Sequence, residues 1–262
     1  MHKILPQRTA VWLRWIVLAT VLGRIAFLVL FGHTLSLETS GYDVYAVNMM
    51  DGHGYTRFDD RSADSDLPPL YPVFLVGMYT VFGRDPLPIA IIQIGFDVLV
   101  VLLIFWIGRR VAGDTAGLFA AAFYGLYPYL LFQNLTVNDT GIFILFLVAG
   151  IAASYRACDT RDWRWAAAVG VAFGFGALTK SFIGLMLPFL ALWWWRQLDL
   201  RAAIRLGAVA GTTLLIVLAP WVIRNTSLHG EFVFISTNGG SNMHQGNNPC
   251  VADYLSRGWD AQ

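Results

Sequence analysis

Long apolar segments separated by short charged gaps make up most of this chain. Each is near the length that a helix needs to cross the hydrocarbon core of a bilayer. The predicted membrane spans are residues 11–32, 87–108, 115–133, 140–156, 164–179, 181–196 and 205–223. Composition agrees, since 56% of the 262 residues are hydrophobic and only 13% are charged. We therefore expect an all-α polytopic membrane protein with about seven transmembrane helices.

Basic residues mark the gaps between these segments and predict the topology. Lys3 and Arg8 precede the first span, and Arg109 and Arg110 follow the second. Two later gaps hold further arginine clusters, namely Arg156, Arg161 and Arg164, then Arg196, Arg201 and Arg205. Lysine and arginine are concentrated in cytoplasmic loops. We therefore expect a cytoplasmic N-terminus and an external loop at residues 33–86.

Two apolar segments need a separate interpretation. Residues 16–31 could be the core of a cleaved signal peptide, but the run is too long for one. Residues 67–83 would invert every arginine cluster if they crossed the bilayer. We expect them to form a helix that lies at the outer interface, dips into it or re-enters. Together, residues 1–223 are predicted to be one transmembrane domain, followed by an external polar tail at residues 224–262.

The first external loop concentrates negative charge. Seven of the 17 acidic residues lie between residues 38 and 72, and they are Glu38, Asp43, Asp51, Asp59, Asp60, Asp64 and Asp66. A loop this long is usually functional or disordered. Its aromatic residues, glycines and Pro68-Pro69 pair favour a functional loop.

Asp43 and Asp66 are the loop carboxylates with the most defined settings. Residues 42–51 have a helical pattern, so Asp43 would lie in the first turn of an amphipathic helix. There it is either an acid favoured by the helix dipole or a general base at the membrane surface. Asp66 precedes two prolines that restrict the backbone, so its carboxylate should be held in place. It is either an ordinary acid at a helix N-terminus or a functional group. Asp59, Asp60 and Asp64 are expected on a solvated loop face.

Four more charged residues stand out by position. Asp97 lies inside an apolar helix, where a charge is costly and usually pairs with a neighbouring helix. Asp139 is expected on an outer turn, on the same side as Asp43. Lys180 lies between two tightly joined helices at their outer ends and could bind lipid headgroups or a phosphate. Arg224 ends the last span on the outside, against the positive-inside trend.

The tail from Ser236 to Pro249 is polar, glycine-rich and dense in amides, including Asn247 and Asn248. Such a segment can contact sugar hydroxyls or phosphate oxygens through amide and backbone donors. It follows no predicted strand and opens no evident helix, so it is not a nucleotide-binding fingerprint.

These features together resemble the polytopic glycosyltransferases of the GT-C fold that use a polyprenyl-phosphate sugar as donor. The chain is most similar to bacterial relatives of protein O-mannosyltransferases and of the lipid A aminoarabinose transferase. The resemblance rests on a series of motifs in order: Asp43-Val44-Tyr45, Gly52-His53-Gly54-Tyr55, Pro68-Pro69-Leu70-Tyr71-Pro72, Gln93 with Asp97, Gly108-Arg109-Arg110, Leu126-Tyr127-Pro128, Leu178-Thr179-Lys180, Pro220-Trp221 through Arg224-Asn225, and Asn238-Gly239-Gly240 through Asn247-Asn248-Pro249. Family members usually run longer, so we expect this chain to be cut short after the last motif.

The resemblance implies an inverting membrane glycosyltransferase of hexosyl or mannosyl type in the bacterial inner membrane. A lipid, glycan or protein would be the acceptor, and no nucleic acid would be involved. It implies Asp43 as the catalytic base and Asp66 as a second catalytic carboxylate of the loop, which assists the base or positions the acceptor. The implied candidates for binding donor phosphate and substrate are Lys180, Arg224, Tyr45, Asp139, Asn247 and Asn248.

Other functions stay open at this point. The loop carboxylates could hold a divalent cation, although their spacing identifies no metal site. A transporter or flippase for a lipid-linked sugar would predict several charges inside the membrane and an inverted repeat. Asp97 is the one deep charge that the pattern shows, and no repeat is evident. A non-catalytic remnant of a split glycosyltransferase is the remaining alternative.

Overall fold

The computed structural model describes residues 5–37, 41–58, 60, 62–133 and 136–251. Over these ranges the chain is helical, and its β-type pairing is an isolated bridge between Ser36 and Thr136. The α-helices and two short 3₁₀ helices are α1 (Gln7–Phe31), η1 (Gly32–Thr34), α2 (Tyr42–Met50), α3 (Leu70–Phe82), α4 (Pro86–Gly125), α5 (Pro128–Gln133), α6 (Thr140–Thr160), α7 (Trp163–Ala177), η2 (Ser181–Leu185), α8 (Met186–Gln197), α9 (Leu200–His229) and α10 (Gly239–Asn247).

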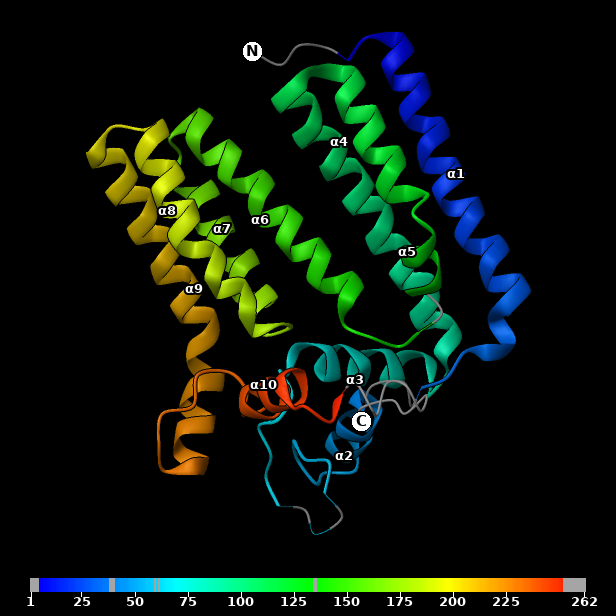
Figure 1. Cartoon of the computed structure of the whole chain (residues 1–262), viewed down its shortest axis with the longest axis vertical. Helices are drawn as coiled ribbons and strands as arrows, with labels where there is room; N and C mark the ends of the chain where they lie inside the picture. The colour runs from blue at the N-terminus through cyan, green and yellow to red at the C-terminus, as the bar shows by residue number, and fades with distance from the viewer. Residues whose placement is uncertain (1–4, 38–40, 59, 61, 134–135, 252–262) are drawn as a thin grey trace.

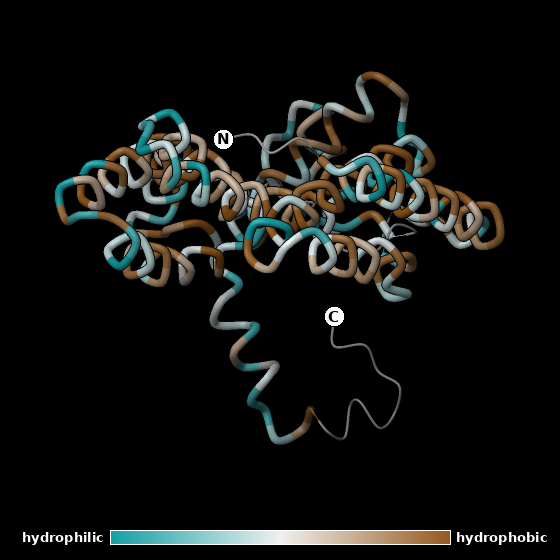
Figure 2. The backbone as a smooth tube through the Cα atoms, turned by 90° about the horizontal axis from the view of Figure 1, so that it is seen from above, coloured by the Kyte–Doolittle hydropathy of each residue, from teal (hydrophilic) through white to brown (hydrophobic). Residues whose placement is uncertain are grey.

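The long helices form two neighbouring groups. Figure 1 shows α1 beside α4 and α5 in one group, and α6 to α9 in the other, with α4 and α6 in contact between them. Seen from above in Figure 2, the groups form one layer from which the α10 segment projects. The start of α1 lies at one end of the helices, and α2 and α3 lie at the opposite end. The described part of the acidic loop and the first turn of α1 are therefore at opposite ends of the bundle.

Four helices in the described part of the chain are long and apolar enough to cross a membrane, namely α1, α4, α6 and α9. This confirms an all-α polytopic membrane protein. The predicted spans at residues 164–179 and 181–196 are helical but shorter, since α7 has 15 residues and α8 has 12. A helix needs about 20 residues to span the hydrocarbon core directly. In the described residues, each of the seven predicted spans nevertheless falls mainly on helix, because α4 covers two of them.

The α4 helix is a hairpin of two antiparallel arms. Gly113 has φ +89°, which an L side chain rarely adopts, and the chain reverses there. The arms then approach so closely that a Cβ on Gly108 would lie 2.9 Å from the Cα of Gly117. The predicted spans 87–108 and 115–133 are these two arms. The second arm ends earlier than predicted, at Gly125, and the short α5 follows from Pro128.

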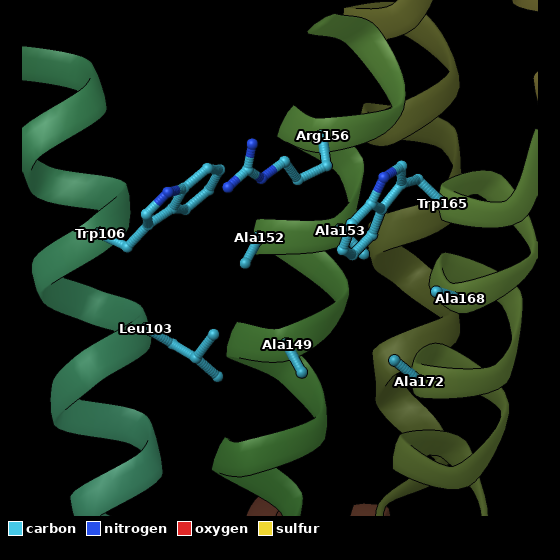
Figure 3. Close-up of a pocket in the computed structure, with 9 residues that line it drawn as sticks. All are labelled: Leu103, Trp106, Ala149, Ala152, Ala153, Arg156, Trp165, Ala168 and Ala172. Atoms are coloured by element: carbon cyan, nitrogen blue, oxygen red, sulfur yellow. The ribbon is translucent and has the colours of Figure 1, made fainter. Parts of the chain in front are cut away.

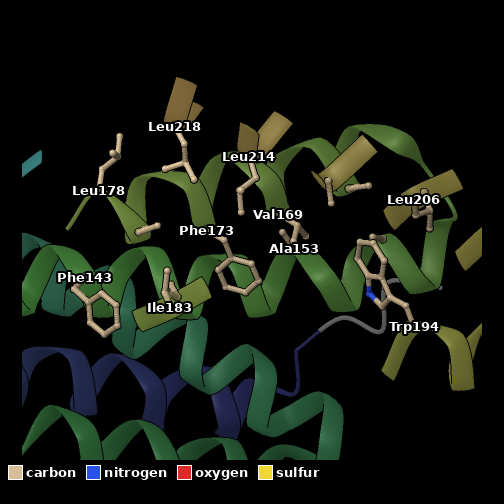
Figure 4. Packing of buried hydrophobic residues seen from close by; sticks show 14 of the residues in the cluster. Phe143, Ala153, Val169, Phe173, Leu178, Ile183, Trp194, Leu206, Leu214 and Leu218 are labelled. Atoms are coloured by element: carbon tan, nitrogen blue, oxygen red, sulfur yellow. The ribbon is translucent and has the colours of Figure 1, made fainter. Parts of the chain in front are cut away.

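The largest apolar core joins α6, α7, α8 and α9. Figure 4 shows Phe173 of α7 and Leu214 of α9 among the side chains that meet there. Small residues let these helices approach, because a Cβ on Gly170 would lie 2.0 Å from Thr213 Oγ1. This packing fixes the α7–η2 turn, which carries Lys180.

The charge inside the bundle is paired, as the sequence predicts. Asp97 on α4 accepts a hydrogen bond at 2.7 Å from the Nε of Arg24 on α1, and the hydroxyl of Tyr124 donates at 2.7 Å. Arg24 is 1% exposed and also donates to the carbonyl of Gly125 at 2.5 Å. The prediction that Asp97 is the one deep charge is wrong, because Arg24 is equally buried within a predicted span.

Two elements at the loop end bear on the predicted boundaries. The α3 helix crosses the ends of the bundle instead of joining it (Figure 1), which agrees with the predicted interfacial helix at residues 67–83. The α9 helix continues to His229, beyond the predicted end of the transmembrane domain at residue 223. The first part of the predicted tail is therefore an extension of the last span.

Candidate functional site

A polar cavity of about 230 Å³ lies at the loop end of the bundle. Five segments that are distant in sequence form it: the start of α2, the residues before α3, the turn before α6, the α7–η2 turn, and the segment that leads into and begins α10. Its lining residues are Tyr42, Leu67, Pro68, Asp139, Thr179, Lys180, Ser181, Phe182, Ser236, Asn238 and Asn242. The cavity adjoins the ends of the apolar helices, where membrane and water would meet.

Lys180 and Asp139 provide the charge in this cavity. The Lys180 amine lies 2.7 Å from Asp139 Oδ1, and the Tyr42 hydroxyl donates to Asp139 Oδ2 at 2.9 Å. The Asp139 side chain is 5% exposed and the Lys180 side chain is 30% exposed. Burial, together with the neighbouring Asp139 carboxylate, raises the pKa of Tyr42 well above its usual value, so the phenol stays neutral. The result is a fixed, reachable cation.

The local fold explains why Lys180 points here. The α7 helix ends at Ala177, and the amide N–H of Lys180 donates to the carbonyl of Gly176 at 2.8 Å. Lys180 then has an extended backbone before η2 begins. The neighbouring Leu178 carbonyl accepts from the Leu70 N–H at 3.0 Å, which ties this turn to the start of α3.

Arg224 holds the acidic loop against the end of α9. Its guanidinium donates to the carbonyls of Asp64 at 2.8 Å and Tyr55 at 3.2 Å, and it lies 4.6 Å from the ring centroid of Trp221. Ser65 contributes a second link by donating to the buried Asn225 at 2.9 Å. The geometry therefore gives Arg224 a positioning role, and it is not among the residues that line the cavity beside Lys180.

The prediction that Asp64 lies on a solvated loop face is wrong, because Asp64 is buried. Asp60 is exposed, as expected. Asp64 is 6% exposed, accepts from the hydroxyl of Tyr45, and lies 3.4 Å from Arg57. Burial and the hydrogen bond to Asp64 raise the pKa of Tyr45 well above its usual value. Asp59 lies outside the described residues.

Asp66 is held in place, as the two prolines after it predict. Its carboxylate lies 2.8 Å from the guanidinium of Arg57, and its own N–H donates to Asp64 Oδ1 at 2.8 Å. The Asp66 side chain is 21% exposed. Asp66 does not line the polar cavity itself, but it directly precedes Leu67 and Pro68, which do.

Asp43 is in the first turn of α2, where the sequence places it, but its carboxylate is enclosed. Arg84 binds both of its oxygens, at 2.5 and 3.0 Å, and the Tyr79 hydroxyl donates at 2.7 Å. Asp43 is 2% exposed. Burial and the bond to Asp43 raise the pKa of Tyr79 above its usual value, so it remains a donor. These contacts tie α2 to α3.

The amide-rich tail differs from its prediction. Residues Gly239–Asn247 form helix α10, although no helix was expected there. The side chains of Asn247 and Asn248 contact residues of the tail itself. Asn247 donates to the Met243 carbonyl at 2.8 Å, and Asn248 Nδ2 lies 3.2 Å from His244 Nε2. The tail residues at the cavity are instead Ser236, Asn238 and Asn242.

A metal site was the remaining possibility for the loop carboxylates. Across the described ranges, no three histidine, cysteine, aspartate or glutamate side chains gather closely enough to hold an ion. The acidic side chains there pair with arginine and lysine, as in Asp66 with Arg57 and Asp139 with Lys180.

Sequence reasoning missed several residues that organise the site. Arg57 and Arg84 were not singled out, yet each pairs with a loop carboxylate. The sequence position of Arg84 could have indicated a partner for a loop carboxylate, because Arg84 lies between the predicted interfacial helix and the second span. No local pattern identifies the partners of Asp64, since Tyr45 and Arg57 reach it only in the folded loop.

The fold and cavity define a class of protein, namely a polytopic membrane protein with a cationic polar pocket at one end of its bundle. The Dolichyl-phosphate-mannose-protein mannosyltransferase family matches residues 66–223, and the chain belongs to this family. The match includes Asp66, Asp139 and Lys180 and begins after Asp43.

Two curated relatives carry the same name in different Pseudomonas species. The chain is 30% identical over 156 residues to the undecaprenyl phosphate-alpha-4-amino-4-deoxy-L-arabinose arabinosyl transferase of Pseudomonas aeruginosa. It is 32% identical over 161 residues to the transferase numbered 2 of Pseudomonas fluorescens. The alignments cover 55% and 58% of this chain, and 27% of each relative. The chain therefore spans about a quarter of the length of these relatives.

Proposed function

We propose that this chain takes part in transferring a sugar from a polyprenyl-phosphate donor to an acceptor hydroxyl at the membrane surface. The observation that carries the proposal is Lys180, a fixed and partly exposed cation in a polar cavity beside the ends of apolar helices. Both relatives are named for an undecaprenyl-phosphate-linked sugar. A lipid-linked donor requires such a cavity at the boundary of membrane and water.

Lys180 would bind the donor phosphate. When the bond between the anomeric carbon and the phosphate oxygen breaks, the lipid phosphate leaves with additional negative charge. A fixed cation stabilises that developing charge without reorganisation. Asp139 holds the lysine in place, with 2.7 Å between Lys180 Nζ and Asp139 Oδ1. The neutral Tyr42 hydroxyl in turn holds Asp139 by donating to its Oδ2 at 2.9 Å.

The acceptor hydroxyl needs a base, and the geometry favours Asp66 for that role. Asp66 is partly exposed and directly precedes the cavity-lining Leu67, whereas Asp43 is enclosed by Arg84 and Tyr79. A general base must come within hydrogen-bond reach of the acceptor hydroxyl, which an exposed carboxylate allows and an enclosed one does not. We therefore assign the role of general base to Asp66 and a positioning role to Asp43. The resemblance implies the opposite, with Asp43 as the base. Direct attack of the acceptor oxygen on the anomeric carbon would invert its configuration.

The remaining features of the proposal follow from the topology. The arginine clusters favour a cytoplasmic N-terminus in the bacterial inner membrane, so the cavity would face the periplasm. The acceptor is a lipid, glycan or protein hydroxyl. The relatives are named for an amino-arabinose, and the sequence resemblance implies a hexosyl or mannosyl donor, so the assay must include both sugars.

The test reconstitutes the purified chain in liposomes with undecaprenyl-phosphate-linked amino-arabinose or mannose and a lipid acceptor. We expect release of undecaprenyl phosphate coupled to formation of a glycosylated product. Movement of the intact donor across the bilayer without product would identify a transporter. Neither product nor donor movement, with a correctly folded chain, would support a non-catalytic remnant and refute the proposal.

A further inference from the structure

A second cavity lies at the other end of the bundle, between α4, α6 and α7. Its volume is about 390 Å³. Figure 3 shows Leu103 and Trp106 on α4 facing Ala149, Ala152 and Arg156 across the gap to α6. Lys180 and the polar cavity lie at the opposite end of these helices. The second cavity is therefore separate from the proposed donor site.

Arg156 stands out as the cation in this mostly apolar cavity. Its guanidinium lies 5.0 Å from the ring centroid of Trp106 and 6.0 Å from that of Trp165. Within the described residues it forms no ion pair with a carboxylate, whereas Arg110 nearby pairs with Asp159 at 2.5 Å. Arg156 thus provides positive charge that no described side chain neutralises.

The surroundings match the two ends of a phospholipid. Ala149 and Arg156 lie on one helix and are separated by roughly 10 Å at about 1.5 Å per residue. Along that distance Leu103 and the alanines line an apolar groove, and the arginine and indoles lie at its polar end. Indole rings are enriched at the depth of lipid headgroups. Basic pockets between transmembrane helices bind anionic headgroups.

We propose that this cavity binds one anionic glycerophospholipid from the leaflet on the N-terminal side. Arg156 would contact the headgroup phosphate, and one acyl chain would lie against Leu103, Ala149 and Ala152. The lipid would fill the space between the two helix groups, since α4 belongs to one and α6 and α7 belong to the other. Lipid binding at this site does not depend on sugar transfer, so it can be tested independently of the proposed function.

Native mass spectrometry of the purified chain tests this site by titration with phosphatidylglycerol or phosphatidylcholine. We expect one tightly bound phosphatidylglycerol and about a five-fold preference over phosphatidylcholine, the contribution of about one basic residue near a headgroup. Arg156→Gln should remove the preference, and Ala149→Phe should remove binding of both lipids by filling the groove. Arg201→Gln and Ala208→Phe are matched controls on the exposed surface of α9.

Thermal unfolding of each variant separates loss of the site from loss of the fold. The Ala149→Phe variant tests the groove even if Arg156→Gln fails to fold. The proposal is overturned if folded Arg156→Gln keeps the lipid preference, or if folded Ala149→Phe retains the same lipid. It is also overturned if wild-type protein forms a lipid-free dimer that Ala149→Phe disrupts, because a second copy would then cover the groove.

Discussion

Arg24 and Asp97 form a buried ion pair that joins α1 to α4, with 2.7 Å between Arg24 Nε and Asp97 Oδ2. The pair connects the first helix of the chain to the α4 hairpin. Tyr124 and the carbonyl of Gly125 add hydrogen bonds from the second arm of α4. One polar cluster therefore fixes three helical segments relative to one another.

Breaking this pair from one side should destabilise the bundle strongly. We expect Asp97→Leu to cost roughly 3–5 kcal/mol, because Arg24 would remain buried without its counter-charge. The double variant Arg24→Met with Asp97→Leu should recover most of the loss, since it removes both charges. Unfolding titrations in detergent with increasing denaturant measure the difference. Equal losses in the single and double variants would show that the pairing itself is unimportant.

Removing the cation of the polar cavity should slow transfer without unfolding the protein. We expect Lys180→Ala to reduce the transfer rate by about 10²–10³-fold, the range for loss of one group that stabilises developing charge. Lys180→Arg should retain part of the activity. Arg201→Ala, on the exposed surface at the other end of the bundle, is the control and should leave the rate unchanged. Full activity of Lys180→Ala would contradict the assignment.

The two loop carboxylates should differ in how their loss affects the protein. Asp66→Asn should lower kcat by about 10²–10⁴-fold with little change in stability, as expected for loss of a general base. Asp43→Asn should chiefly lower stability, because it weakens the contacts with Arg84 and Tyr79. The transfer assay and thermal unfolding, run on both variants, separate these roles. A stable Asp43→Asn variant with no activity would restore the base to Asp43.

Arg224 should control the order of the acidic loop. Its side chain bonds to the carbonyls of Tyr55 and Asp64 and to Ser65. Without these bonds the loop should detach more often from α9, and we expect Arg224→Ala to raise the rate of proteolysis between residues 51 and 66. Arg205→Ala, an exposed arginine at the opposite end of α9, serves as the control. Unchanged cleavage would show that other contacts hold the loop.

Those parts of the fold that depend mainly on hydrophobicity and charge along the chain could be predicted from the sequence. Apolar segments and arginine clusters predicted the helices, the hairpin arms and the position of α3, because membrane insertion depends on summed hydrophobicity and charge. The site was harder to predict, since its partners come from distant segments. Lys180 and Asp139 were each singled out, yet their contact depends on the packing of α7 against α6. Asp64 looked solvated in sequence because burial of a loop carboxylate depends on Arg57 and Tyr45 folding over it.

Close packing of α7 on α9 gives a last prediction that depends on no assignment of function. A Cβ on Gly170 would lie 2.0 Å from Thr213 Oγ1 and 2.2 Å from the carbonyl of Ala210. Neither α9 backbone nor a short side chain can move that far, so Gly170→Ala should force the helices apart and cost about 1–3 kcal/mol. Gly211→Ala is the matched control, because its Cβ would meet nothing within 4 Å. Thermal unfolding should show a lower transition for Gly170→Ala and little change for Gly211→Ala, whereas equal transitions would mean that α7 and α9 are not packed as closely as described.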